Sequence, residues 1–343
     1  MTTVYVTHPR YVEHDFKGHP EHAGRIRSVW QKLESARLLG RLLVQEAQPV
    51  SDDLLRTVHT DEYVNILNWI PTQDKLVQFD ADTYALPLSP EVARLSAGGV
   101  VAAVDAVLSG QADNGLVATR PPGHHALAAR GMGFCLLGNV PLGVKHAQRQ
   151  YGVKRVLVVD FDVHHGNGTQ DMFYDDDSVL FISTHQYPFY PGTGAVSETG
   201  SGAGTGYTLN IPLVAGCGDA TYALVYQEVL WRAARRFQPE LIMVSAGFDA
   251  HWTDPLAMMR LSLTGYAHLT HELIKMADEL CGGKIIFAME GGYDLNALGY
   301  GMQNVAHALL GDDEITDPLG TRGGAEPDIL ALIDHLKHLH NLE

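Results

Sequence analysis

Short apolar runs recur along the chain, and longer stretches whose apolar residues have helical spacing separate most of them. The runs hold four to six residues and are mostly rich in β-branched side chains, which is typical of strands buried on both faces of a parallel sheet. We predict strands at Val4–Thr7, Leu116–Thr119, Val156–Val159, Val179–Ser183, Tyr207–Pro212, Leu241–Ser245 and Lys284–Met289.

Helical spacing and turn residues place the remaining elements. We predict helices at 21–36, Asp61–Ile70, Ser89–Ser109, Val140–Gln150, Met172–Tyr174, Thr221–Phe237 and Leu263–Leu280. The segment His185–Gly206 is instead long, Gly-rich and aromatic, and a loop of this kind often shapes a binding site. The repeated strand–helix order, with no linker or internal repeat, predicts a single α/β domain (residues 1–343) with a mainly parallel central sheet.

Polar side chains alternate directly after the predicted strand Val156–Val159. Asp160, Asp162 and His164 are two residues apart, so in an extended chain they project from the same face. A buried strand end holds two carboxylates and an imidazole only if they are compensated, because desolvating an unpaired charge is costly. A bound metal ion would compensate them, whereas a surface loop with solvated carboxylates would need no ion.

Three other predicted strands also end in unusual polar residues. In chain order these residues are the pair His124 and His125, then Asp249, then Tyr293. Open parallel sheets place their binding sites at the carboxyl ends of the strands, where these side chains would meet. Two carboxylates and one imidazole would supply three metal ligands, the paired histidines would transfer protons, and the tyrosine hydroxyl would donate to an oxyanion. The pattern therefore indicates a hydrolytic metal site.

Composition and charge indicate which kinds of partner and which cellular location to expect. The formal net charge of −16 argues against a nucleic-acid partner and is compatible with a cationic substrate. The chain has three cysteines and no C-x-x-C pair, which predicts a protein without disulfides. We find no signal-peptide pattern and no apolar run of membrane length, and therefore expect a cytoplasmic protein without a membrane partner. The histidines near the amino terminus (His8, His14, His19 and His22) fit no metal-binding spacing, so we expect them to pack in a loop and a helix start.

Several motifs, in a fixed order, resemble those of the zinc-dependent histone deacetylases and their bacterial amidohydrolase relatives. They are HPEH-x-x-R, RPPGHHA, GFC, VVDFDVHHGNGT, PGTG, SAGFDA and EGGY, and they extend from about His19 to Asn296. The HHGNG and HPEH-x-x-R forms are most similar to the class II branch. The resemblance implies a three-layer α/β/α fold of the arginase/deacetylase type and one Zn²⁺ per chain, and it implies a substrate that is an acyl-lysine peptide or protein or a small acetylated amine.

The resemblance also implies a role for each matching residue. The implied zinc ligands are Asp162, His164 and Asp249. The implied catalytic residues are His124 and His125, with the second as general base, together with Asp160, which orients a histidine, and Tyr293, which polarises the amide carbonyl. The implied substrate-binding residues are Gly133, Phe134, Tyr190 and Leu256, and the implied supporting residues are Asn167 and Arg25. Structural K⁺ or Na⁺ ions are implied at Ser183 and Thr184, beside Asp160, Asp162 and His164, and at Phe173, Asp176, Val179 and Tyr207.

Three positions depart from common family patterns. Asn167 stands where class I enzymes have an Asp, which gives His125 a less anionic neighbour. Tyr190 replaces the common Phe, and Leu256 stands where polyamine-specialised relatives carry a Glu. The last difference favours acyl-lysine, and an acetylpolyamine or small-metabolite amide stays as the alternative substrate.

Two other functions fit the sequence less well. A manganese ureohydrolase of related architecture needs a second set of carboxylate ligands, and the AGFDAHW segment offers Asp249 alone before Asp254. A non-catalytic acyl-lysine reader would not need the paired histidines and Tyr293. Nothing in the sequence specifies an oligomeric state.

Overall fold

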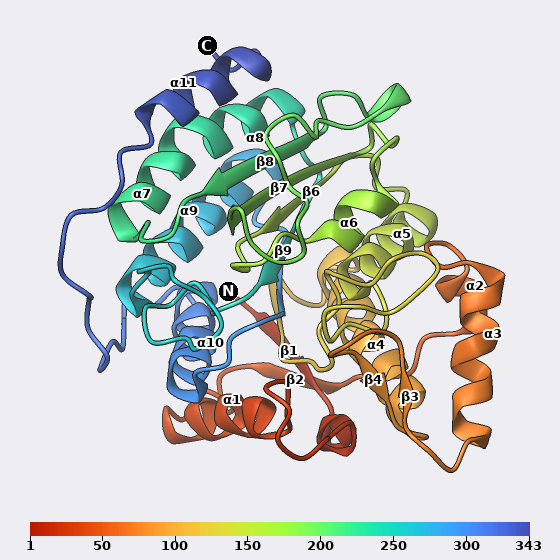
Figure 1. Cartoon of the computed structure of the whole chain (residues 1–343). Coiled ribbons are helices and arrows are strands. Elements are labelled where there is room, and N and C mark those ends of the chain that lie inside the picture. The colour runs from red at the N-terminus through yellow and green to blue at the C-terminus, as the bar shows by residue number, and fades with distance from the viewer.

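One eight-stranded sheet forms the centre of the molecule, which is described over all residues 1–343 by a computed structural model (Figure 1). The strand order is β2-β1-β5-β10-β9-β6-β7-β8, and every neighbouring pair is parallel. The strands are β1 (Thr3–Thr7), β2 (Leu43–Glu46), β5 (Asn114–Val117), β6 (Val156–Asp160), β7 (Val179–Gln186), β8 (Thr208–Leu213), β9 (Leu241–Ala246) and β10 (Ile285–Met289). A separate two-stranded sheet joins β3 (Val77–Gln78) to β4 (Tyr84–Ala85).

Helices cover both faces of the sheet, so the predicted α/β class, three-layer arrangement and mainly parallel sheet are confirmed (Figure 1). The helices are α1 (Gly24–Ser35), α2 (Asp52–Leu55), α3 (Asp61–Trp69), α4 (Ser89–Leu108), α5 (Asn139–Tyr151), α6 (Asn167–Met172), α7 (Asp219–Val225), α8 (Trp231–Phe237), α9 (Leu263–Cys281), α10 (Leu295–Leu309) and α11 (Leu330–Leu339). Helices α4 and α5 pack together on one side, and α1, α10, α9 and α7 form the layer on the other. A π-helical turn, Tyr226–Leu230, joins α7 to α8.

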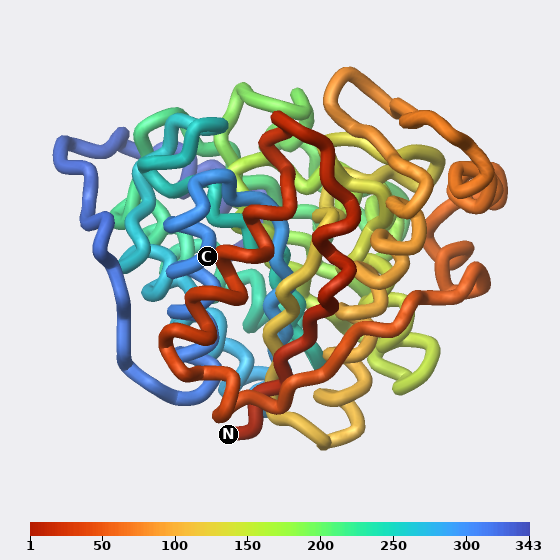
Figure 2. Tube along the Cα trace, turned by 90° about the horizontal axis from the view of Figure 1, so that it is seen from below, coloured from red at the N-terminus to blue at the C-terminus, as the bar shows by residue number.

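The sheet brings distant parts of the chain together. The red amino-terminal strand β1 lies beside the gold strand β5, and the blue strand β10 follows on the far side of β5 (Figure 2). Buried apolar side chains from all of these strands pack against the two helical layers. Because the strands are parallel, their carboxyl ends lie along one edge of the sheet.

Several predicted boundaries were wrong by a few residues. The first helix begins at Gly24 rather than near residue 21, because Glu21 lies before it and its fully buried side chain is paired with Arg120. Strand β5 starts and ends two residues earlier than predicted, since Asn114 and Gly115 pair with β1. Strand β7 continues to Gln186, because β8 pairs with it along its whole carboxyl half.

Two kinds of element were missed. The edge strand β2 has only four residues, with alternating partly buried and exposed positions, which gives little sequence signal. Helix α10 has fifteen residues where only short helices were expected. Twelve of them are buried, including the polar residues Gln303, Asn304 and His307, so the helix lacks the solvated polar face of a typical surface helix. The helix expected at Met172–Tyr174 is only the end of α6, which stops at Met172.

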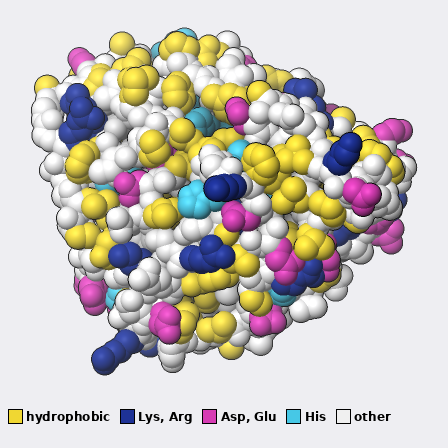
Figure 3. Space-filling view, turned by 60° about the horizontal axis from the view of Figure 1, so that its bottom comes forward, with side chains coloured by type: hydrophobic (Ala, Val, Ile, Leu, Met, Phe, Trp, Pro, Cys, Tyr) yellow, Lys and Arg dark blue, Asp and Glu magenta, His cyan; other side chains and the backbone are white.

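The surface carries charges of both signs. On the face shown in Figure 3, acidic and basic side chains are interspersed among hydrophobic ones, histidines appear between them, and Lys and Arg form no continuous patch. No helix combines the length and the apolar character that crossing a bilayer would require.

Candidate active site

The unusual polar residues follow four strands that are neighbours in the sheet. These strands are β5, β10, β9 and β6, in that spatial order. The pair His124 and His125 comes after β5, Tyr293 after β10, Asp249 after β9, and Asp160 is the last residue of β6. The parallel sheet therefore brings the predicted catalytic and metal-binding residues to one edge.

Asp162, His164 and Asp249 converge as a candidate metal-binding group. Each offers one ligand atom, and these atoms all lie within 4.8 Å of one another. The Nδ1 atom of His164 is 3.2 Å from Asp162 Oδ1 and 3.2 Å from Asp249 Oδ2. Both carboxylates are 0% exposed, which rules out the solvated loop considered from the sequence.

The charges of this group fit a bound cation. Burial by itself lowers the pKa of His164, but hydrogen bonds with Asp162 and Asp249 outweigh it and raise the pKa to about 10. One oxygen of each carboxylate accepts a backbone hydrogen bond. The Gly291 N–H donates to Asp162 Oδ2 at 2.7 Å, and the Val163 N–H donates to Asp249 Oδ1 at 2.9 Å. The other two oxygens face His164 and attract positive charge. Two carboxylates and one imidazole are a ligand set that suits a divalent metal ion.

The paired histidines are each held by their Nδ1 atom. His124 Nδ1 is 3.0 Å from Asp160 Oδ2, and His125 Nδ1 is 2.7 Å from Asn167 Oδ1. Their ring centroids are 4.0 Å apart. With Nδ1 occupied, the Nε2 atom of each ring is left for chemistry, and His124 Nε2 lies 3.8 Å from Asp162 Oδ2.

The surroundings shift the pKa values of the two histidines in opposite directions. Burial by itself lowers the pKa of His124, but the carboxylates of Asp162 and Asp160 raise it well above the usual value. Burial and the neighbouring His124 lower the pKa of His125 well below the usual value. A pair with separated pKa values suits one proton donor and one proton acceptor.

Tyr293 is placed by a turn rather than by a strand or helix. Arg25 Nε donates to the Gly292 carbonyl at 2.7 Å, and its guanidinium carbon lies 4.9 Å from the centroid of the Tyr293 ring. The ring also meets Phe134 edge-on, with centroids 5.8 Å apart. Arg25, taken from the sequence as a supporting residue, thus contacts both the turn and the tyrosine.

A cavity of about 240 Å³ connects these groups to the surface. It is lined by Asp82, His125, Gly133, Phe134, His164, Phe189, Tyr190, Leu256 and Tyr293. All four predicted substrate-binding residues are in this set. Asp82 and Phe189 were missed, although Phe189 lies in the aromatic loop His185–Gly206 that was expected to shape a site. Aromatic walls of this kind suit a linear aliphatic chain.

Three buried charged residues with no role predicted from the sequence support the site. Arg120 and Glu21 form a buried ion pair at 2.6 Å, and Arg120 directly precedes the Pro-Pro-Gly-His-His segment. Glu290 Oε2 accepts from the N–H groups of Gly123 (2.6 Å) and His124 (3.2 Å). The position of Glu290 directly after a buried strand is the same signal that marked Asp160, and it would have found this residue.

The residues proposed for monovalent cations form two groups. Ser183 and Thr184 lie on β7 beside Asp160 of β6, and Thr184 Oγ1 is 3.5 Å from the Asp160 carbonyl. Phe173, Asp176, Val179 and Tyr207 lie near the starts of β7 and β8. Two carbonyls of this second group, those of Phe173 and Tyr207, already accept backbone hydrogen bonds.

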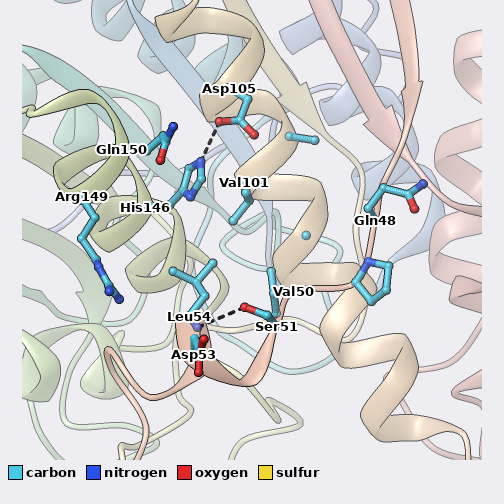
Figure 4. Close-up of a pocket in the computed structure, with 13 residues that line it drawn as sticks. Gln48, Val50, Ser51, Asp53, Leu54, Val101, Asp105, His146, Arg149 and Gln150 are labelled. Atoms are coloured by element: carbon cyan, nitrogen blue, oxygen red, sulfur yellow. Dashed lines mark hydrogen bonds and ion pairs between the residues drawn. The ribbon is translucent and has the colours of Figure 1, made fainter.

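A second, polar groove lies between α4, α5 and the segment before α2 (Figure 4). Its lining includes His146 and Asp105, whose side chains face each other at 2.6 Å, and Arg149, which extends from α5. It contains none of the residues predicted from the sequence to carry chemistry. The groove is therefore separate from the candidate active site.

Comparisons with known proteins show what this chain is similar to. Residues 19–309 match the family described as "Histone deacetylase domain". The chain is 37% identical over 359 residues to histone deacetylase 10, chloroplastic, from Oryza sativa subsp. japonica, covering 99% of this chain and 81% of that protein. It is 39% identical to a probable deacetylase from Archaeoglobus fulgidus, and the match covers 91% of this chain and 88% of that protein. The crystal structure of the HDA15 HD domain matches with a TM-score of 0.90 and 36% identity, and the match covers 99% of this chain and 94% of that one.

Proposed function

The chain belongs to the histone deacetylase family, and on that premise we propose that it is a zinc-dependent amidohydrolase that removes acetyl or other acyl groups from the side-chain amine of acyl-lysine. The family makes it a hydrolase of amide bonds. One observation carries the finer proposal: His164, whose ligand atom lies within 4.8 Å of those of Asp162 and Asp249, lines the same aromatic cavity as His125 and Tyr293.

Asp162, His164 and Asp249 would hold the zinc ion. Three protein ligands are the usual number in a catalytic zinc site, which keeps a further position open. When bound there, zinc would act as a Lewis acid on the amide carbonyl and would lower the pKa of water toward ~7.

The paired histidines would move the protons. His125 Nε2 is free to accept a proton from the attacking water, because its Nδ1 is held by Asn167 and its pKa is low. His124, whose pKa is raised beside Asp160 and Asp162, would supply electrostatic help or donate the proton that the leaving amine requires. Both roles follow from the different carboxylate and amide partners of the two rings.

Tyr293 would stabilise the transition state. Its hydroxyl would donate a hydrogen bond to the substrate carbonyl oxygen as negative charge develops there. Burial raises the pKa of this tyrosine well above its usual value, so the hydroxyl keeps its proton.

The cavity walls support a lysine-like substrate. Phe134, Phe189 and Tyr190 would surround the aliphatic part of the side chain, and Leu256 would contact it at the rim. The same walls also fit an acetylpolyamine or a small acetylated amine, which remains the alternative substrate. Structural K⁺ or Na⁺ ions and a cytoplasmic location belong to the proposal as well.

Acetate release from an acetyl-lysine peptide is the direct test. We expect zinc-loaded protein to release acetate, a chelator to stop the reaction, and added zinc to restore it. Acetylated putrescine, spermidine and cadaverine in parallel assays separate the two substrate classes by kcat/KM. If the zinc-loaded protein binds acetyl-lysine peptides but releases no acetate from any substrate, it is a reader and the proposal is wrong.

A further inference from the structure

The backbone of Tyr293 lies in a turn that secondary structure does not hold. Strand β10 ends at Met289 and α10 begins at Leu295, so the Tyr293 N–H has no partner in a sheet or helix. Two glycines precede the tyrosine, and Gly292 has a φ of +117°, a conformation that other residues rarely adopt. Something outside the turn must fix where this side chain starts.

Asp254 supplies that contact. Its Oδ2 atom accepts from the Tyr293 N–H at 2.7 Å and from the Asp294 N–H at 3.0 Å. Its Oδ1 atom accepts from the Leu256 N–H at 3.0 Å. The residue is 6% exposed, so water does not compete strongly for these oxygens.

We propose that Asp254 is a positioning residue for Tyr293, joining the backbone of the catalytic tyrosine to the rim segment that carries Leu256. This inference rests on the proposed function of Tyr293. Arg25 and Asp162 hold the earlier part of the turn through Gly292 and Gly291, while Asp254 holds the N–H of the tyrosine itself. Both of its oxygens act only as acceptors toward N–H donors.

An Asp254→Ala substitution removes both acceptor oxygens at once. Asparagine is less suitable, because its amide can turn so that its oxygen still accepts from Tyr293 and Asp294 and only the Leu256 N–H loses its acceptor. Misplacing the tyrosine hydroxyl by a fraction of an ångström to about 1 Å is expected to lower kcat by about 10- to 100-fold, with KM changed by less than about threefold.

The double variant with Tyr293→Phe gives the decisive measurement. If Asp254 acts through the tyrosine hydroxyl, the losses in kcat are not additive, and the double variant is about as slow as Tyr293→Phe alone. If the losses multiply, or if Asp254→Ala keeps full kcat, the inference is wrong. If Tyr293→Phe itself retains full activity, the proposed function of Tyr293 fails instead, which is a different outcome.

Amide hydrogen exchange of the metal-free protein gives a readout independent of turnover. We expect exchange in a peptide covering 290–296 to be at least about tenfold faster in Asp254→Ala, because the N–H groups of Tyr293 and Asp294 lose their acceptor. Asp317→Ala is the matched control: Asp317 also accepts from backbone N–H groups, those of Thr264 and Gly320, but does not contact the turn. It should leave both exchange at 290–296 and kcat unchanged, and unchanged exchange in Asp254→Ala would contradict the proposal.

Discussion

The Nδ1 atom of His125 lies 2.7 Å from the Oδ1 atom of Asn167. An amide oxygen only accepts hydrogen bonds, so in this arrangement His125 carries its proton on Nδ1 and leaves Nε2 unprotonated. Asn167 begins the short helix α6, which follows the predicted metal ligand His164 by a few residues. One short segment therefore provides both a metal ligand and the partner that sets the tautomer of the proposed base.

Removing this acceptor should disable the base. In Asn167→Ala we expect kcat to fall by about 10- to 100-fold, because His125 loses the contact that fixes its tautomer and orientation. Asn167→Asp keeps an acceptor oxygen and should retain more activity than the alanine variant. Steady-state kinetics with zinc content measured on each sample test this, and equal activity in the alanine variant and the parent would contradict the role of Asn167.

Tyr293→Phe should fold and bind zinc but lose most deacylase activity. The expected loss is about 10²–10³-fold in kcat, the usual effect of removing one donor to an oxyanion. Circular dichroism and metal analysis establish that the variant is intact, and acetate release measures the loss. Near-full activity in an intact variant would show that Tyr293 does not stabilise the transition state.

Zinc binding should stabilise the folded protein. Asp162 and Asp249 are fully buried and face one another across His164, so a divalent ion removes repulsion that the metal-free protein retains. We expect the Tm of chelator-treated protein to rise when stoichiometric Zn²⁺ is added. In Asp249→Asn, zinc should produce a much smaller rise, and a rise equal to that of the parent would place the metal elsewhere.

Local patterns in the sequence predicted the main parts of the site. The alternation of Asp160, Asp162 and His164 is visible in the sequence because all three lie within five consecutive residues. Only Asp160 belongs to strand β6, and the chain bends at Asp162–His164, so the extended geometry expected for the three residues stops at the strand end. The roles of His125 and Tyr293 came from the resemblance to a family, since a histidine pair or a tyrosine after two glycines has no unique meaning. The parallel strand order explains why these separate segments meet.

Contacts between distant residues were the part that the sequence could not predict. Glu21 and Arg120 are separated by 99 positions, and each by itself resembles an ordinary surface charge. The contacts of Asp254 could not be predicted for the same reason, because its partners Tyr293 and Asp294 belong to another loop. Their importance depends on burial, which a single sequence does not reveal for a charged residue.

The buried ion pair between Glu21 and Arg120 leads to a prediction about stability and pH. Glu21 Oε2 is 2.6 Å from Arg120 Nη2, and Arg25 Nη1 is 3.1 Å from the other oxygen. Burial by itself raises the pKa of Glu21, but the two guanidinium groups, that of Arg120 most strongly, lower it to about 2. Glu21→Gln leaves both cations without their charge partner in the interior and should cost about 3–5 kcal/mol at pH 7.

The pH dependence has a definite sign. The pKa of Glu21 is lower in the folded protein than in the unfolded chain, so its stabilising effect is complete above pH 4.5 and is lost as the pH falls from 4.5 toward about 2. Urea unfolding of the parent and Glu21→Gln at pH 7, 4 and 3 should therefore give a stability difference that shrinks as the pH decreases. Glu91→Gln is the control, because Glu91 pairs with Arg10 at the surface with its side chain 50% exposed, and it should cost only about 0–1 kcal/mol at any pH. A difference for Glu21→Gln that stays constant from pH 7 to pH 3 would mean that its carboxylate charge does not stabilise the loop carrying the paired histidines.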